Sequence, residues 1–154
     1  MFTQLHMNST FAERREMIVK HRPQYYQLSN QTSGTLQKSD IIDELISYEG
    51  SWPAGGIIST ADNMLRFANA MLSAYHGNDQ VQELWTPETI GKIKPDWMSD
   101  NEYAKGWQVI HYPDDLPYPY KTLIWHDGGL TGVSTHLTLF PKENMVGLTS
   151  SAVS

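Results

Sequence analysis

Hydrophobic positions recur with two different periods along the chain, and each period predicts a different kind of element. Between residues 61 and 75 the apolar side chains return every three to four positions, as on one face of an α-helix. The apolar stripe of this helix is expected to consist of Ala61, Met64, Leu65, Ala68, Leu72 and Tyr75. Ser59 or Thr60 stands where an N-cap is needed, after the turn signals of residues 52–56.

Capping patterns predict two further helices. Thr10 and Glu13 have the spacing of a capping box, in which each side chain satisfies a backbone N–H, so a helix is expected to begin near Thr10. Thr86-Pro87-Glu88 places proline at the first position of another helix. Between these helices, residues 24–28 are predicted as a short strand and residues 29–39 as a loop or hairpin.

The last third of the chain has the period of two that is typical of strands. Strands are expected over residues 106–112, 121–126, 134–140 and 145–152. Within one of them, Leu137 and Leu139 alternate with polar side chains, which predicts a single buried face. Helices that precede an antiparallel meander predict an α+β fold.

Composition and charge narrow the function. The chain has 154 residues, of which 40% are hydrophobic and 18% charged, which is sufficient for one domain with a core. A net charge of −6 argues against a nucleic-acid-binding surface, and no apolar run reaches the ~20 residues of a membrane helix. The chain has no cysteine, which excludes disulfides, thiolate metal sites and cysteine nucleophiles. We expect a small molecule, a peptide or another protein as the partner.

The densest polar cluster is Trp125-His126-Asp127-Gly128-Gly129-Leu130-Thr131-Gly132, and the residues alone leave several interpretations open. The plainest is a glycine-rich hairpin with His126 as an ordinary polar residue. A phosphate loop is disfavoured because the glycine spacing matches neither phosphate-binding pattern. A metal site would use His126 and His136, together with His111 and Asp127, at a spacing unlike zinc signatures.

The remaining interpretation is a catalytic strand, in which backbone N–H groups face an anionic oxygen and His126 contacts the substrate. A triad of Ser134, His126 and Asp127 is not compatible with such a strand. Because adjacent strand residues point to opposite faces, Asp127 could not orient the imidazole of its neighbour.

Several motifs, taken in order, resemble the beta-lactamase-related serine hydrolases, which include the penicillin-binding-protein-like enzymes. Residues 5–10 resemble L-G-M-x-x-T, with His6 at the glycine, and residues 53–67 are similar to A-G-G-L-x-S-T-A-x-D-L-x-R-F. Tyr103-Ala104-Lys105-Gly106-Trp107 resembles Y-G-x-G-W. His126-Asp127-Gly128-Gly129 resembles the third active-site motif, K-T-G or H-x-G. Residues 10–56 look most like the animal mitochondrial serine beta-lactamase-like proteins.

The resemblance implies acyl transfer through a serine acyl-enzyme, with an amide, peptide or ester substrate and no cofactor or metal. His126 would take the first position of the third motif and bind a substrate carboxylate or the catalytic hydroxyl network. The backbone N–H of Gly129 would be one oxyanion donor, and Gly128 would leave room for the substrate. Asp127 would lie with these residues in the substrate-binding segment.

The sequence departs from the family pattern in one important respect. It has neither Ser-x-x-Lys nor Tyr-x-Asn; the nearest match is Thr35-Leu36-Gln37-Lys38. We therefore expect residues 1–154 to be the C-terminal portion of one such domain, without the region of these motifs and without the final helix. Alone, the chain is expected to be inactive.

Two other hypotheses remain open. One is a non-catalytic scaffold or self-assembling module derived from the same fold, and the other is a small independent hydrolase or metal protein that uses His126, His136 and an aspartate. The resemblance alone suggests a mitochondrial location.

Overall fold

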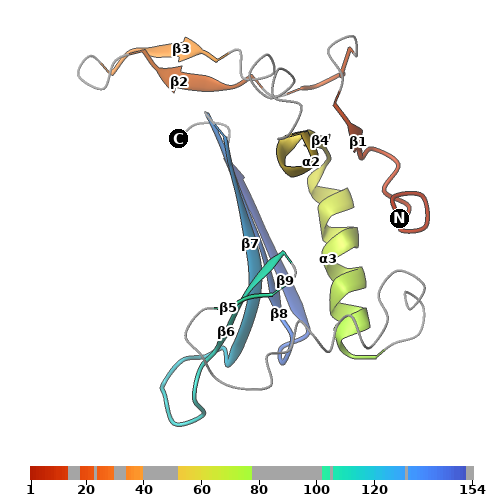
Figure 1. The fold of residues 1–154 in the computed structure, drawn as a ribbon, viewed down its shortest axis with the longest axis vertical. Coiled ribbons are helices and arrows are strands. Elements are labelled where there is room, and N and C mark those ends of the chain that lie inside the picture. The colour runs from red at the N-terminus through yellow and green to blue at the C-terminus, as the bar shows by residue number, and fades with distance from the viewer. Residues whose placement is uncertain are drawn as a thin grey trace. The chain divides into compact units, whose positions relative to one another are not determined.

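Helix and strand positions come from a computed structural model, which describes residues 1–13, 18–22, 24–29, 34–39, 52–77, 102–104, 106–130 and 132–151 (Figure 1). In chain order the elements are β1 (Phe11–Ala12), β2 (Tyr26–Leu28), β3 (Leu36–Lys38), α2 (Trp52–Gly55), β4 (Ile57–Ile58), α3 (Ala61–Tyr75), β5 (Glu102–Ala104), β6 (Trp107–His111), β7 (Thr122–Leu130), β8 (Val133–Phe140) and β9 (Met145–Ser151). The predicted helix at Thr86-Pro87-Glu88 lies outside the described residues. The α+β class is confirmed.

The chain divides into two compact units. The first consists of residues 1–8, 61–126 and 136–148, and the second of residues 9–60, 127–135 and 149–154. The strands β7, β8 and β9 contribute residues to both units. Each unit is described separately below.

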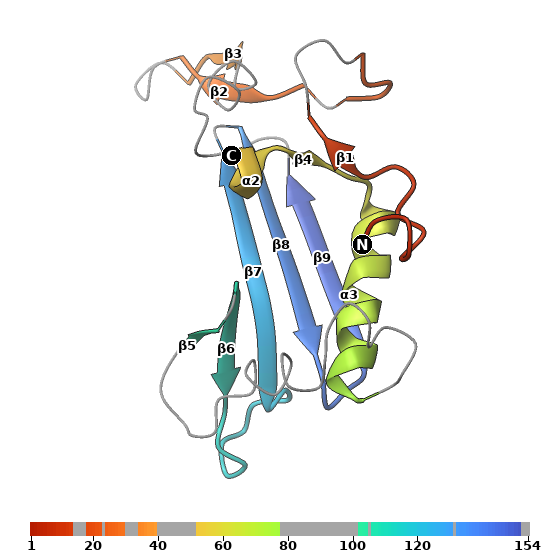
Figure 2. The ribbon, with the colours of Figure 1, turned by 45° about the vertical axis from the view of Figure 1, so that its right-hand side comes forward.

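The largest sheet has the strand order β5-β6-β7-β8-β9, so each strand pairs with its neighbour in the sequence (Figure 2). Ala104 pairs with Trp107 between β5 and β6, and His111 pairs with Thr122 between β6 and β7, both in antiparallel register. The predicted antiparallel meander is thus confirmed, and β5 adds a strand that the sequence did not predict. A turn at residues 141–144 joins β8 to β9, with Asn144 at φ 50°.

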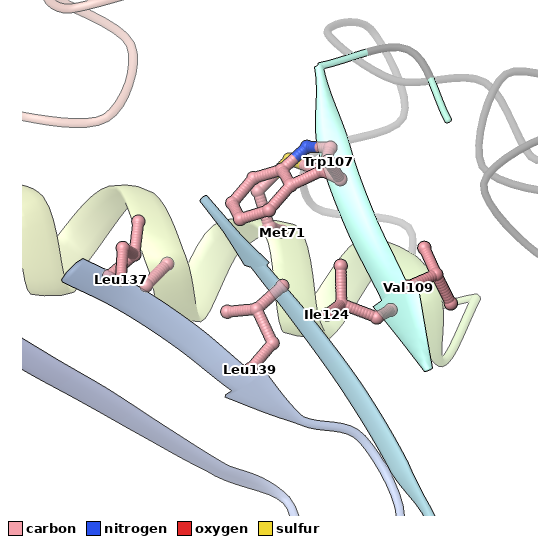
Figure 3. Close-up of a cluster of buried hydrophobic side chains, with 7 residues drawn as sticks. Met71, Trp107, Val109, Ile124, Leu137 and Leu139 are labelled. Carbon is pink, nitrogen blue, oxygen red and sulfur yellow. The ribbon is translucent and has the colours of Figure 1, made fainter. Parts of the chain in front are cut away.

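The core of the first unit lies between α3 and the sheet. Its buried members are Ala68, Met71, Trp107, Val109, Ile124, Leu137 and Leu139 (Figure 3). The predicted single buried face of β8 is only partly correct: Leu137 and Leu139 are both in this cluster, but Thr138, on the other face, is also buried at 5% exposure. The predicted stripe of α3 is only partly correct: Ala61 is exposed, whereas Met71 belongs to the core. The residues that face the core recur every three or four positions, and the first residue of the helix is not one of them.

Thr60 immediately precedes α3 and therefore occupies the N-cap position. The other candidate, Ser59, uses its hydroxyl elsewhere, 2.7 Å from the hydroxyl of Thr10. Asp62 lies in the first turn, where the helix dipole favours an acidic residue, and it accepts a hydrogen bond from Arg66 Nε at 2.9 Å.

No helix in the described part of the chain combines the length and apolarity needed to span a bilayer.

In the second unit, the helix predicted to begin near Thr10 does not begin there, and residues 14–17 of the predicted helix lie outside the described residues. Phe11 and Ala12 form β1, which pairs antiparallel with β4. The backbone N–H of Glu13 donates to Gly56 O at 2.8 Å. The capping-box prediction is therefore wrong, because partners more than 40 positions away satisfy the same groups that a local cap would have satisfied.

The predicted strand at 24–28 and the hairpin after it are confirmed as β2 and β3. Tyr26 pairs with Lys38 and Leu28 with Leu36 in antiparallel register. The ladder extends to Ser39, whose N–H donates to Tyr25 O at 2.8 Å. This register sets which side chains share a face of the hairpin.

His111, at the end of β6, should make the free energy of unfolding of the first unit depend on pH. Its Nδ1 lies 3.1 Å from Thr122 Oγ1, and burial, followed by the nearby positive charge of Lys142, lowers the pKa of the imidazole below 6.5. Between pH 6.5 and the lower folded-state pKa, the unfolded chain takes up a proton that the folded chain does not. Stability should therefore fall as pH is lowered through this window and should be fully retained above it.

Replacing Lys142 by Met should raise the pKa of His111 toward its ordinary value and reduce this acid-induced loss. NMR titration of the His111 ring, with urea unfolding at pH 7 and pH 5, measures both effects. An unchanged His111 titration in Lys142→Met would contradict the role given to Lys142.

Candidate functional site

The predicted third-motif residues lie within β7. The sequence predicted that this strand ends at residue 126, but it continues through Gly128 and Gly129 to Leu130. The glycine-rich hairpin that the sequence suggested is present between β7 and β8, but its turn does not lie at the glycine pair. The turn comes after Leu130, where Gly132 has a φ of 79°.

A change in exposure marks this part of the strand. Thr122 and Ile124 are buried, whereas His126, Asp127, Gly128 and Gly129 are all exposed. Residues of one strand face alternate sides, so His126 and Gly128 share one side and Asp127 and Gly129 share the other. The strand thus presents an exposed backbone segment with an imidazole at its beginning.

Gly128 has a close neighbour on β8. A Cβ at position 128 would lie 2.5 Å from Thr135 Oγ1, and this hydroxyl also donates to Gly128 O at 3.4 Å. Gly129 differs, since an added Cβ there would meet no atom within 4 Å. Thr135 therefore leaves no room for a side chain at position 128, whereas a side chain at position 129 would have room.

Gly128→Ala should force the Thr135 side chain to rotate and lose its hydrogen bond, at a cost of about 1 kcal/mol. Gly129→Ala should leave the free energy of unfolding nearly unchanged. Adding Thr135→Ala to Gly128→Ala should remove the overlap, so the double variant should be no less stable than Thr135→Ala alone. Urea unfolding of these variants tests this local packing, and an equal loss at both glycines would contradict it.

The turn between β7 and β8 lies against the backbone of β2, within the second unit. A Cβ at Gly132 would overlap with the carbonyl oxygen of Tyr26 and would lie 2.9 Å from its amide nitrogen. Because the Tyr25–Ser39 pair is hydrogen-bonded, the next pair, Tyr26–Lys38, is a non-hydrogen-bonded pair whose N–H and C=O groups point outward. The free edge of β2 therefore faces the turn that follows the candidate site.

A buried ion pair lies at the start of the same unit. Arg22 Nη2 contacts Glu13 Oε1, and the two side chains are 19% and 8% exposed. Burial, followed by the negative charge of Glu13, raises the pKa of Tyr25, and the positive charge of Arg22 opposes this. Glu13 follows β1 and Arg22 precedes β2. The ion pair is therefore part of the second unit and does not involve the β7 segment.

The histidines proposed for a metal site have other neighbours. His136 Nε2 lies 2.5 Å from Thr138 Oγ1, and His111 contacts Thr122. Across the part of the chain that the structure describes, no three histidine or acidic side chains are grouped so that they could hold a metal ion.

Thr135 and Tyr26 are the neighbours of the candidate site that sequence analysis missed. A two-residue turn after Leu130 would have placed residue 135 opposite residue 128. The turn was instead expected at the glycine pair, so this pairing was not predicted. The Tyr26 contact had no local signal, because it joins segments more than 100 residues apart.

The glycine expected by the resemblance at position 6 has a structural counterpart. His6 has a φ of 54°, in the left-handed region that favours glycine, and the neighbouring Met7 is buried. His6 thus keeps the backbone conformation that a glycine would adopt most easily.

The α+β fold and this sequence of motifs agree with a direct comparison of families. The family model described as Beta-lactamase matches residues 1–151, and the chain belongs to this family of serine hydrolases.

Its relatives include the mitochondrial serine beta-lactamase-like protein LACTB of Homo sapiens, 26% identical over 161 residues. That of Mus musculus is 27% identical over 161 residues, and that of Bos taurus 26%. In each case the similarity covers 93% of this chain and 28% of the relative. The chain thus spans less than a third of the length of these relatives.

Proposed function

We propose that this chain provides the substrate-binding strand of a beta-lactamase-related serine hydrolase, with His126–Gly129 of β7 lining the acyl-transfer site. The observation that carries the proposal is that these four residues are exposed within a strand in which the preceding residues, 122–125, are buried or half-buried. Family membership supports it, because the exposed segment coincides with the third-motif resemblance.

The chemistry assigns a different task to each part of the segment. A serine hydroxyl attacks the acyl carbon, the carbonyl oxygen becomes an oxyanion, and the leaving group departs when the acyl-enzyme forms. The N–H of Gly129 is proposed as one donor to that oxyanion, and His126 as a donor to a substrate carboxylate. Water then releases the acyl group and regenerates the serine.

The attacking serine is proposed to come from a part of the domain outside these residues. No Ser-x-x-Lys occurs in the sequence, and the curated relatives extend well beyond the matched region. In this proposal residues 1–154 form the C-terminal portion of the domain and do not form an acyl-enzyme by themselves.

Benzylpenicillin, which carries an amide and a carboxylate, is a suitable probe of the segment. When the ¹⁵N-labelled chain is titrated with it, the amide signals of Gly128 and Gly129 should shift without covalent attachment. His126→Ala should raise Kd about tenfold, since a hydrogen bond to a charged group is worth about 1.5 kcal/mol. Mass spectrometry after incubation should show no adduct.

Ser134→Ala is the matched control, because Ser134 is an exposed polar residue of the next strand and has no assigned role. It should leave Kd unchanged. Saturable binding that leaves residues 126–129 unaffected would overturn the site, and a stoichiometric penicilloyl adduct would overturn the assignment of the serine to another region.

The absence of Ser-x-x-Lys also favours a second candidate, a non-catalytic or self-assembling module built on the same fold. This candidate predicts concentration-dependent association in light scattering and no benzylpenicillin binding. The titration therefore separates the two.

We propose a mitochondrial location from the names of the relatives. Immunofluorescence of the endogenous protein against a mitochondrial marker should show overlap, and staining confined to another compartment would refute this.

A further inference from the structure

The loop that joins β6 to β7, residues 112–121, exposes a cluster of apolar side chains (Figure 2). Leu116 and Tyr118 are 39% and 50% exposed, and Pro117 and Pro119, which alternate with them, are exposed as well. The loop leads into the buried beginning of β7, so it is separate from the exposed segment of that strand. Apolar side chains gathered on an exposed surface are typical of a binding site, and these lie outside the proposed acyl-transfer site.

The side chain of Lys121 bridges this loop. Its ammonium group donates to the carbonyl oxygens of Pro113, Asp114 and Leu116 at 3.3, 3.1 and 2.7 Å. The two ends of the loop are joined by a hydrogen bond of 2.8 Å from Tyr112 N–H to Lys121 O. These bonds order the loop before any partner binds, so that less conformational entropy is lost on binding.

Ring contacts also support the exposed part of the loop. The centre of the Tyr118 ring lies 4.4 Å from that of Tyr112, and the Tyr120 ring lies 4.5 Å from Phe140 of β8. Tyr112 and Tyr120 are half-buried, whereas Tyr118 is exposed. The loop therefore uses two of its tyrosines for packing and presents the third to solvent.

Pro117 and Pro119 limit how a partner can recognise this segment. Because proline has no backbone N–H, the segment is a poor strand to add to the edge of another sheet. Each proline also disfavours the helical conformation in the residue before it, and residues 112–121 contain neither helix nor strand. The remaining mode is the one used for proline-rich segments, in which exposed side chains dock in an apolar, aromatic-lined groove.

Acidic residues next to this segment define the charge of the partner. Asp114 and Asp115 are exposed, and the chain has a net charge of −6. Asp114 already contacts Lys142 at 3.6 Å, so Asp115 is the better anchor for a cation of the partner. A second copy of this chain would carry the same net charge, and an anionic membrane would repel these carboxylates. A groove with cationic groups at its rim complements the loop.

We propose that Leu116–Pro119, together with Asp115, is a docking segment for a partner protein that has an aromatic-lined groove with a cationic rim. Grooves lined by aromatic side chains are the surfaces with which SH3 and WW domains bind proline-rich segments. This inference is independent of the acyl-transfer function, because it concerns a different part of the chain.

Purified SH3 and WW domains, chosen in sets with basic and with acidic groove rims, are the probes. Each is titrated into the ¹⁵N-labelled full chain. Domains with basic rims should bind with a Kd below about 1 mM, and those with acidic rims should bind more weakly. The amide signals of Asp115, Leu116 and Tyr118 should shift, while those of residues 126–129 should stay in place.

Leu116→Ser/Tyr118→Ser should raise this Kd at least about tenfold, because both apolar contacts are lost. Met145→Ser is the matched control, since Met145 is 41% exposed and lies on β9, and it should keep the wild-type Kd. Asp115→Asn should raise the Kd about threefold at low salt and have little effect at 1 M salt, where charges are screened. Asp62→Asn, the same change at an exposed position of α3, should have no effect.

Lys121→Met tests the ordering of the loop. It removes the three hydrogen bonds of the ammonium group and leaves the docking side chains in place, so the Kd should rise about tenfold as binding has to order the loop. Amide exchange of residues 114–118 should become faster in this variant. The remaining amide signals of all variants verify that the fold is retained.

Three results would overturn the proposal. In the first, no domain with a basic rim binds. In the second, such domains bind but Leu116→Ser/Tyr118→Ser keeps the wild-type Kd, so that they dock elsewhere. In the third, light scattering shows self-association that the double variant abolishes, so that the loop binds a second copy. None of these results depends on whether benzylpenicillin binds at β7.

Discussion

Replacing Gly132 by Ala should destabilise the second unit by about 3 kcal/mol, which would be among the largest effects of a single methyl group in this chain. Two costs add. A φ of 79° costs an L-residue about 1 kcal/mol relative to glycine, and the new methyl group would overlap with the Tyr26 carbonyl. Neither obstacle can be relieved by rotating a side chain, because the opposing atoms belong to the backbone.

Gly77→Ala is the matched control for this prediction. Gly77 has a φ of 77°, but a Cβ there would meet no atom within 4 Å. It should therefore show the conformational cost alone, about 1 kcal/mol. Urea unfolding gives both values, and equal losses in the two variants would show that the turn does not abut β2.

Removal of one partner from the Glu13–Arg22 pair is the second large effect that we expect. Glu13→Ala should cost about 3 kcal/mol, because it leaves the Arg22 guanidinium, whose Nε and Nη2 are shielded from water, without its opposite charge. The double variant Glu13→Leu/Arg22→Met should recover most of the loss, since two apolar side chains need no compensating charge.

The exposed pair on α3 is the comparison. Asp62 and Arg66 form an ion pair at 2.9 Å with side chains 73% and 50% exposed. Arg66→Ala should cost only about 0.4 kcal/mol, because water screens this pair and replaces it. Denaturant unfolding of the three variants measures these costs, and a double variant as unstable as Glu13→Ala would disprove that an uncompensated charge is the cause.

Elements whose signals are local were predicted well. The period of the apolar residues placed α3 and the strands near β6, β8 and β9, because each periodicity is a property of one segment. The third-motif segment was also found from consecutive residues, His126 to Gly129. Its role in acyl transfer remains a proposal.

Elements whose partners are distant were predicted poorly. Thr10 and Glu13 carry a good helix signal, yet Ser59 and Gly56 satisfy their hydrogen bonds and the segment is extended. The glycine pair at 128–129 suggested a turn, but β7 continues through both glycines, and Thr135 of β8 lies opposite Gly128. In both cases a tertiary contact outweighed a local preference that is worth about 1 kcal/mol.

The sequence by itself determined the family, the α+β class, the position of the third-motif segment and the absence of Ser-x-x-Lys from these residues, since all of these depend on residue type and spacing. Only the tertiary structure decided that β7 continues through its glycines, that Gly132 lies against the backbone of Tyr26, and that Leu28 and Leu36 are exposed. The physical reason is that strand pairing and close backbone contact join residues far apart in the chain, and no local pattern of apolar and polar positions records which partner each will meet.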